Sequence, residues 1–129
     1  MSASAEQIRD QQRSTWDEFS AGWRKWDAEV LGWHAPFGDA VIREAWLRPD
    51  SAVLDVAAGT GEPGLTAAAL VPGGGVTLLD ISEGMLRVAS EKAAARGLAN
   101  VETAVGDAAA LPFDDGSFDA VLCRFGLMF

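Results

Sequence analysis

The chain contains little of what several classes of function require. Its 129 residues include one cysteine, Cys123, one histidine, His34, and no tyrosine. A single cysteine cannot form an internal disulfide, and with a single histidine the chain is short of ligands for a zinc site. No stretch approaches the ~18 apolar residues of a membrane helix, and the N-terminus has no apolar signal-peptide core. We therefore expect a cytoplasmic protein that binds no metal.

Basic residues are also scarce. Ten Lys and Arg stand against nineteen Asp and Glu, which gives a net charge of −9. A nucleic-acid backbone or an anionic membrane requires a basic face, so neither is expected as the main partner. Hydrophobic residues make up 49% of the sequence. That content and the chain length predict a single domain over residues 1–129 with its own core.

Residues 1–48 are predicted to form a helical segment. A first helix is expected to begin near Trp16, after the capping residues Ser14 and Thr15. A second is expected from about Phe37 to Leu47. Aromatic side chains recur at helical spacing on one face of the first helix, at Trp16, Phe19, Trp23 and Trp26. Charged residues lie off that stripe, at Asp17, Arg24 and Lys25.

From residue 49 onward, strand and helix patterns alternate. Short apolar strands are predicted at 52–56, 76–80, 101–105 and 118–124, and helices at 63–70 and 82–96. Gly97 follows the second helix and suits a C-terminal cap. This order is typical of an α/β fold, a Rossmann-like parallel sheet with flanking helices. Residues 49–129 would form its ligand-binding part.

A glycine-rich turn follows the first predicted strand. Gly59-Thr60-Gly61-Glu62-Pro63-Gly64 matches the pattern G-x-G-x-x-G. The pattern alone is weak evidence, because an ordinary strand-to-helix turn can produce it. A strand before it and a helix start after it favour a loop whose backbone approaches a nucleotide-like ligand.

Three carboxylates lie in or just after successive strands. Asp55 stands inside the first strand and can either face a cationic ligand or brace the glycine loop. Asp80 ends the second strand and can accept both hydroxyls of a ribose, or cap the next helix. Asp107 follows the third strand and can accept from an exocyclic amine, or serve as a turn residue. Together they predict a crevice for a positively charged adenosine compound.

These motifs resemble the class I S-adenosylmethionine-dependent methyltransferases of the ubiquinone/menaquinone-biosynthesis-like group. Residues 53–61 (VLDVAAGTG) are similar to that family's first motif, and residues 79–86 (LDISEGML) to its ribose-binding motif. Gly106-Asp107-Ala108, Leu111-Pro112-Phe113 and residues 117–121 (SFDAV) are similar to its third and fourth strand regions. The resemblance covers about residues 50–129.

The resemblance implies a role for each matching residue. The loop from Ala57 through Gly59 to Gly61 would cradle the methionine part of S-adenosylmethionine. Asp80 would hold the ribose. The remaining implied contacts are Ile81 and Met85 against the adenine, Asp107 and Ala108 at its edge, and Cys123 and Arg124 beside the methionine. The aromatic helix would fold over the site as a lid, although packing into a core explains its tryptophans equally well.

The chain departs from the family pattern in two places. Ala57 stands where the family most often has glycine, and it would be strained if the turn required a positive φ. The family fold has seven strands, whereas this chain ends after the fourth. We therefore expect the N-terminal part of a longer or split protein. It would associate through the open edge of strand 118–124 or with a missing C-terminal half.

The resemblance implies methyl transfer to a small-molecule acceptor. No catalytic residue is assigned, because alignment and exclusion of water suffice for a sulfonium methyl donor. Two alternatives stay open. A nicotinamide-dependent oxidoreductase fits the glycine pattern and Asp80, but not Asp55 within the strand or the Asp107-Ala108 element. The other alternative is a truncated, inactive fragment that binds S-adenosylmethionine weakly or not at all.

Overall fold

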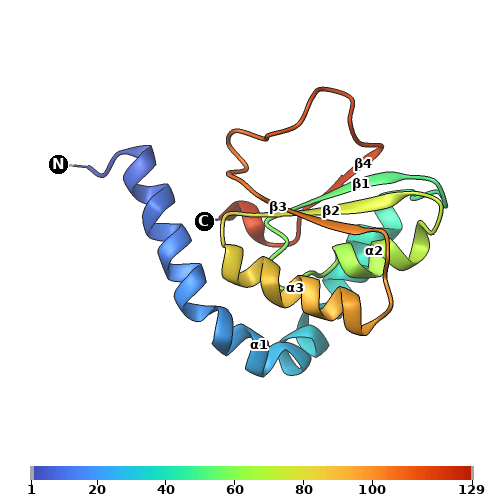
Figure 1. Cartoon of the computed structure of the whole chain (residues 1–129), viewed down its shortest axis with the longest axis horizontal. Helices are drawn as coiled ribbons and strands as arrows, with labels where there is room; N and C mark the ends of the chain where they lie inside the picture. Colours follow the sequence, from blue (N-terminus) through green and yellow to red (C-terminus); the bar gives the residue numbers. More distant parts are fainter. Residues whose placement is uncertain (1, 129) are drawn as a thin grey trace.

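The N-terminal segment is one long helix. The computed structural model describes residues 2–128 and places helix α1 from Ala5 to Glu44. Ser4 caps α1 in a capping box, in which its hydroxyl accepts from the Gln7 N–H and the Gln7 side chain accepts from the Ser4 N–H. The predicted start near Trp16 and the predicted break into two helices are therefore wrong. Pro36 lies inside α1, which continues in a curve (Figure 1), because a proline can bend a helix without ending it.

The remaining elements form a parallel sheet with two helices on one face, which confirms the predicted α/β architecture. The strands are β1 (Ala52–Val56), β2 (Gly75–Asp80), β3 (Val101–Val105) and β4 (Ala120–Leu122), in the order β3-β2-β1-β4. Helices α2 (Gly64–Leu70) and α3 (Glu83–Ala95) connect the first three strands, and a short 3-10 turn, η1, spans Gly126–Met128. Strand β4 is shorter than the predicted 118–124.

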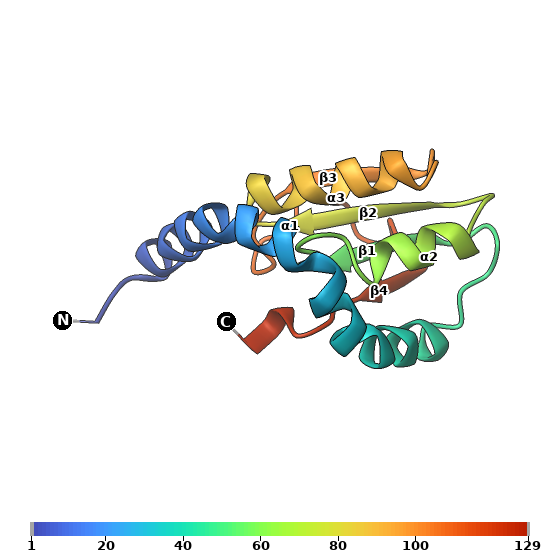
Figure 2. The same cartoon turned by 90° about the horizontal axis from the view of Figure 1, so that it is seen from below.

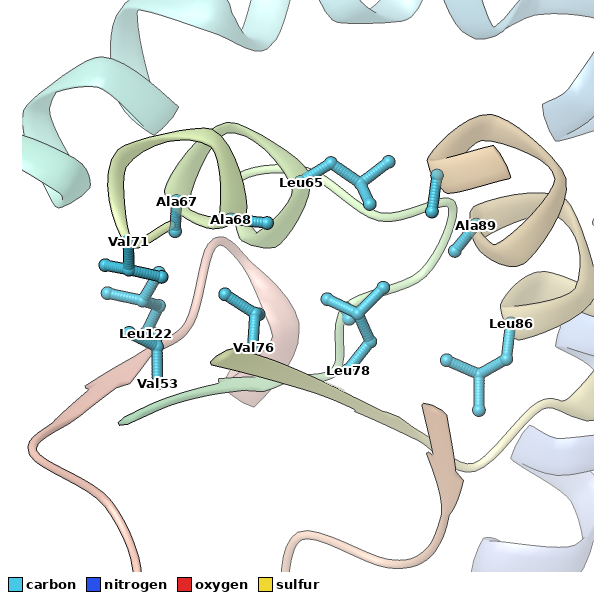
Figure 3. Packing of buried hydrophobic residues seen from close by; sticks show 12 residues of the cluster. Val53, Leu65, Ala67, Ala68, Val71, Val76, Leu78, Leu86, Ala89 and Leu122 are labelled. Carbon is cyan, nitrogen blue, oxygen red and sulfur yellow. The ribbon is translucent and has the colours of Figure 1, made fainter. Parts of the chain in front are cut away.

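Helices α2 and α3 lie over one face of the sheet (Figure 2), and the main core lies between them and the sheet (Figure 3). Val53 of β1, Leu78 of β2 and Leu65 of α2 are fully buried there. Gly97 ends α3 with a φ of +68°, as its position predicted. The C-terminal part of α1 adds Val41 to the edge of this core. The apolar cluster therefore fixes β1 and β2, the two strands that carry Asp55 and Asp80.

A loop rather than a helix covers the opposite face of the sheet. Leu54, Val56 and Leu79 point to that side and are packed against Phe113 and Phe118 of the segment between β3 and β4. The two phenylalanine rings meet edge to face, with centroids 5.0 Å apart. This smaller cluster explains why β1 and β2 carry apolar side chains on both faces of the sheet.

Strand β4 lies at one edge of the sheet in residues 2–128. It pairs with β1 through Ala120, Val121 and Leu122. Val121 is 61% exposed, and Leu127 and Met128 farther along are more exposed still. The apolar edge that the sequence predicted is therefore present at this side of the sheet.

Candidate functional site

A cavity of about 710 Å³ opens at the carboxyl ends of β1, β2 and β3. This volume is typical of small-molecule sites, and ligands of open α/β sheets bind at this end of the strands. Its wall combines the loop after β1, the end of β2, residues 106–109, the inner side of α1 and residues 124–128. Eight of the ten predicted site residues line it: Ala57, Gly59, Asp80, Ile81, Met85, Asp107, Ala108 and Arg124.

Asp80 ties the glycine loop to the start of α3. Its carboxylate accepts hydrogen bonds from the N–H groups of Gly59, at 2.8 Å, and Ser82, at 2.9 Å. Gly59 has a φ of +55°, a conformation that glycine adopts without strain. Burial raises the pKa of the Asp80 carboxyl above its ordinary value, against the lowering effect of these N–H donors. Each carboxylate oxygen retains a lone pair with which it can accept from a ligand hydroxyl.

Asp55 and Gly61 do not line the cavity. Asp55 is fully buried beneath the loop, where it accepts a 2.8 Å hydrogen bond from the Gly64 N–H. A Cβ on Gly64 would lie 2.3 Å from the Leu78 side chain and 2.7 Å from the Asp55 carboxylate, so a larger residue would displace one of these buried side chains. Burial raises the pKa of Asp55 to about 7. Of the two roles that the sequence left open for Asp55, the geometry favours the brace.

Ala57 has the positive φ that the sequence analysis named as a source of strain at this position. Its φ is +55°, in the left-handed region that disfavours residues with a Cβ. The residue still lines the cavity, beside Gly126 of the 3-10 turn η1. The loop therefore keeps its glycine-like shape although it holds an alanine here.

Asp107 lies where the sequence placed it, directly after β3. The Gly106 N–H donates to the Asp80 carbonyl at 3.0 Å, which brings the ends of β2 and β3 together. The Asp107 carboxylate accepts from the Ala109 N–H at 2.9 Å and fixes the following turn. The carboxylates of Asp80 and Asp107 therefore lie at neighbouring strand ends, and Glu62 of the glycine loop adds a third carboxylate to the cavity wall.

The aromatic stripe of α1 divides between the cavity and solvent. Trp16 and Trp23 line the cavity. Phe19 and Trp26 are more than half exposed, and with Trp23 they line a shallow apolar groove on the outer side of the helix. The stripe therefore belongs only in part to the site. Its role as a lid stays a prediction.

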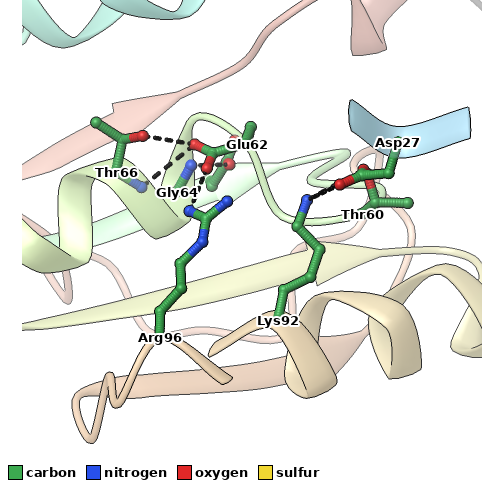
Figure 4. Close-up of polar contacts among 8 residues, drawn as sticks. Asp27, Thr60, Glu62, Gly64, Thr66, Lys92 and Arg96 are labelled. Carbon is green, nitrogen blue, oxygen red and sulfur yellow. Dashed lines mark hydrogen bonds and ion pairs between the residues drawn. The ribbon is translucent and has the colours of Figure 1, made fainter. Parts of the chain in front are cut away.

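Two acidic residues of α1 contact the loops of the site: Asp17, which the sequence placed off the aromatic stripe, and Asp27, which the sequence did not single out. The Asp17 carboxylate accepts from the Ser82 hydroxyl and the Gly84 N–H. The Asp27 carboxylate accepts from the Thr60 hydroxyl and pairs with Lys92 (Figure 4). Positions 17 and 27 have the same spacing as Trp16 and Trp26, one residue farther along the chain. An acidic stripe beside the aromatic one was therefore visible in the sequence. No local pattern indicated which loop residues its two carboxylates contact.

Buried Glu62 is another residue that the sequence reading missed. It follows Gly61 in the loop and pairs with Arg96 near the end of α3 (Figure 4). It also accepts from the Thr66 hydroxyl at 2.7 Å. Two polar bridges, at Glu62 and at Asp27, therefore connect the glycine loop to α3.

Two other kinds of functional element are absent from residues 2–128. No group of three or more His, Cys, Asp or Glu side chains is placed to hold a metal ion. No helix in the same described range combines the length and hydropathy needed to span a membrane.

A parallel sheet with a glycine loop and carboxylates at its strand ends defines a Rossmann-like ligand-binding domain. A model of the methyltransferase domain family matches residues 53–129, and the chain belongs to this family. It is 42% identical over 95 residues to demethylmenaquinone methyltransferase of Geobacillus kaustophilus. The matched segment covers 73% of this chain and 41% of that relative. A C-methyltransferase of ubiquinone/menaquinone biosynthesis from Ectopseudomonas oleovorans is 41% identical over 98 residues, 74% of this chain and 58% of that relative.

A solved structure supports the same grouping. The crystal structure of an S-adenosylmethionine-dependent methyltransferase from Aquifex aeolicus matches 67% of this chain and 46% of its own, with a TM-score of 0.60 and 30% identity. The chain thus spans about half the length of the relatives it matches, or less. All three relatives are methyltransferases by name, which gives no support to the nicotinamide-dependent oxidoreductase that the glycine pattern left open.

Proposed function

We propose that this chain forms the cofactor-binding part of an S-adenosylmethionine-dependent methyltransferase that acts on a small-molecule acceptor. The observation that carries the proposal is the cavity in which Gly59, Asp80 and Asp107 meet at the carboxyl ends of three parallel strands. Family membership supports the same activity.

The residues present fit this cofactor. Asp80 lies beside the loop amide of Gly59 and retains acceptor capacity for ribose hydroxyls. Ile81 and Met85 offer apolar surface next to Asp80 for a flat ring, and Asp107 lies beside them at the end of β3. The carboxylates of Asp80 and Asp107 give this end of the cavity the negative charge that suits a sulfonium compound.

The chain's own residues would bind and orient the cofactor and would exclude water from the site. S-adenosylmethionine supplies a methyl group on a positively charged sulfur, which is already a good leaving group. Asp80 and the glycine loop would hold the nucleoside in one orientation, while Trp16 and Phe125 would exclude water from the opposite side. No residue is assigned to proton transfer, in agreement with the sequence reading.

We place the acceptor on the side of the cavity formed by α1 and the C-terminal segment, where most of the lining is apolar. Its apolar residues come from α1 and from the C-terminal segment, at Ile8, Trp16, Phe125, Leu127 and Met128, and the polar side chains of Arg9, Gln12 and His34 line the cavity beside them. An apolar ring is the acceptor type that such a wall would bind. The names of the two curated relatives, which specify demethylmenaquinone and ubiquinone/menaquinone biosynthesis, support a quinone-like acceptor. A cytoplasmic location stays a prediction.

The open edge of β4 supports one further part of the proposal. Exposed Val121 and the apolar residues after it would associate with another chain or with a C-terminal half of the fold. Light scattering of the purified chain tests this association. A monodisperse monomer that melts cooperatively would contradict it.

Calorimetry with S-adenosylhomocysteine, S-adenosylmethionine and NAD tests the proposed cofactor. We expect both sulfur compounds to bind and Asp80→Ala to weaken their binding at least tenfold, because it removes a buried acceptor. Asp39→Ala, at an exposed position on α1, is the matched control and should bind normally. Binding of NAD alone would overturn the proposal. Binding of none of the three ligands would favour an inactive fragment.

A further inference from the structure

Helix α1 carries two carboxylates that reach across to the two loops of the cofactor cavity. We propose that Asp17 and Asp27 are positioning residues, which hold the loop after β2 and the glycine loop in the geometry that binds the cofactor. This inference rests on the proposed function, because it concerns the same cavity. It assigns to α1 a role that depends on two polar contacts, in addition to any cover that its aromatic side chains provide.

Asp17 acts on the loop between β2 and α3. One of its carboxylate oxygens accepts from the Ser82 hydroxyl at 2.6 Å and from the Gly84 N–H at 3.0 Å. Ser82 also caps α3 and donates its own N–H to Asp80. Asp17 is therefore connected to the predicted ribose-binding carboxylate through a single residue. A shift of Asp17 would move the donor that orients Asp80.

Asp27 acts on the glycine loop. One of its oxygens accepts from the Thr60 hydroxyl at 2.8 Å, and the other lies 2.8 Å from the Lys92 ammonium (Figure 4). The side chains of Asp27 and Lys92 are mostly buried, at 23% and 17% exposure, so water screens this contact only in part. Thr60 stands between Gly59 and Gly61, so Asp27 restrains the loop at its centre.

A third contact between the same two helices offers a control. Arg24 of α1 pairs with Glu91 of α3 at 2.7 Å, but both side chains are about half exposed and neither lines the cavity. Arg24 lies on the same side of α1 as Asp17 and Asp27, at spacings of seven and three residues. It therefore holds the helices together without contacting either cofactor loop.

Gly84 provides a second way to separate α1 from the site. A Cβ at this position would lie 2.8 Å from the Ser20 hydroxyl oxygen and 3.2 Å from an Asp17 carboxylate oxygen. The Gly84→Ala variant would therefore push α1 away from the start of α3 and leave both carboxylates in the chain.

The two contacts also predict a reciprocal effect. If docked α1 strengthens cofactor binding by some factor, then the bound cofactor strengthens docking of α1 by the same factor. The chain supplies its own reporter of this docking. Its tryptophans are all in the N-terminal 46 residues, at positions 16, 23, 26, 33 and 46, and it has no tyrosine. Intrinsic fluorescence therefore reports on α1 and the turn that follows it.

The experiment measures S-adenosylhomocysteine binding by calorimetry and the ligand-induced change in tryptophan fluorescence, on the whole 129-residue chain. The variants are Asp17→Ala, Asp17→Asn, Asp27→Ala, Gly84→Ala and, as the control, Arg24→Ala. We expect the two alanine variants at the aspartates and Gly84→Ala to bind about tenfold more weakly, because each loses a charge-assisted contact to a loop. Arg24→Ala should change the affinity less than twofold.

The conservative variant separates positioning from general stability. The amide oxygen of Asp17→Asn can still accept from Ser82 and Gly84, so this variant should recover most of the affinity. Circular dichroism melting without ligand identifies any variant that fails to fold, and Gly84→Ala and Asp17→Asn then carry the test. Ligand should change the fluorescence of the wild type, and this change should shrink in the weakened variants.

Each outcome decides the inference separately from the proposed function. A wild-type chain that does not bind S-adenosylhomocysteine contradicts the proposed function. Wild-type binding with unchanged affinity in folded Asp17→Ala and Asp27→Ala overturns the inference and leaves the function standing. An equal loss in Arg24→Ala also overturns it, because contact between the helices would then matter rather than the loops.

Discussion

The sheet region, residues 51–105, and helix α1 enclose the same cavity by different means. In the sheet region, Val53, Leu78 and Asp55 are fully buried, and the loops of the site start from strands fixed by this core. Within α1, Gly38 is the one residue that the structure describes as buried, and Trp33 is 74% exposed. Polar contacts at Asp17 and Asp27 connect α1 to the site.

This difference between the two regions predicts that they contribute to different properties, the sheet region to folding stability and α1 to ligand binding. Burial of apolar surface is the dominant favourable contribution to folding, so substitutions in the sheet region should change the free energy of unfolding. Partly exposed polar contacts contribute little to that free energy, yet they can determine how two loops are placed. We therefore expect α1 to influence ligand affinity more than global stability.

The largest expected effect comes from a cavity in the core. Leu78→Ala removes a fully buried side chain of β2 and should lower the free energy of unfolding by about 3 kcal/mol. The matched variant on α1 is Trp33→Ala, which removes a larger side chain that is mostly exposed. It should change the free energy of unfolding by about 0.5 kcal/mol or less. Urea denaturation followed by circular dichroism measures both. Equal losses would remove the distinction between the two regions.

The next effect depends on pH. Asp55 has an ordinary pKa of 3.8, which burial raises to about 7 in the folded chain. Between these values the folded state binds a proton that the unfolded state has lost, so the free energy of unfolding falls as the pH rises from about 4 to about 7. Burial raises the pKa of Asp80 as well, which acts in the same direction.

Asp55→Asn tests this pH dependence. The wild type should lose on the order of 2 kcal/mol of stability between pH 5 and pH 8, and the variant should show a much flatter profile. Urea midpoints at several pH values provide the measurement. Asp39→Asn, an exposed substitution on α1, should retain the wild-type slope. A slope that persists in Asp55→Asn would assign the proton to another group.

A pair of glycines gives opposite effects in the two regions. Gly64→Ala places a Cβ against Leu78 and Asp55 and should lower the free energy of unfolding by about 2 kcal/mol. Gly22→Ala has open space around the new Cβ inside helix α1 and should raise helix stability by about 0.8 kcal/mol. Thermal melting shows both signs. A neutral Gly64→Ala would mean that the loop moves freely over β2.

The smallest effect concerns the strained alanine of the glycine loop. Ala57 has a φ of +55°, which costs about 1 kcal/mol in a residue with a Cβ. Ala57→Gly should therefore stabilise the chain by about 0.5 kcal/mol, after part of the gain is lost to backbone entropy. Ala58 is a buried neighbour without a positive φ, so Ala58→Gly should destabilise the chain. Differential scanning calorimetry resolves the two.

Local patterns in the sequence predicted the sheet region well. Strands 52–56 and 101–105 match β1 and β3 residue for residue, because each is a short segment with two valines between clear turn signals. The glycine loop and the strand-end carboxylates were equally visible, since parallel strands bring their carboxyl ends to one edge.

The sequence predicted α1 and its contacts less well. Ser14 and Thr15 suggested a helix start, but the capping box at Ser4 begins the helix ten residues earlier. Two separate helices were expected here, whereas α1 continues through Pro36 as one curved helix. The partners of Asp17 and Asp27 lie 65 or more residues away in three of four contacts, and no local pattern encodes such a pairing. The Asp55–Gly64 brace depended on side-chain direction, which the sequence left open.

The pairing of β2 on both sides has a consequence for insertions and deletions. Val56 is aligned with Leu79, and Val105 with Asp80, so hydrogen bonds to β1 and to β3 fix the register of β2. Successive side chains of a strand point to opposite faces. Deleting one residue from the middle of β2 would therefore leave the Asp80 carboxylate on the opposite face, one position from its loop, even if the strand kept its pairing with β1.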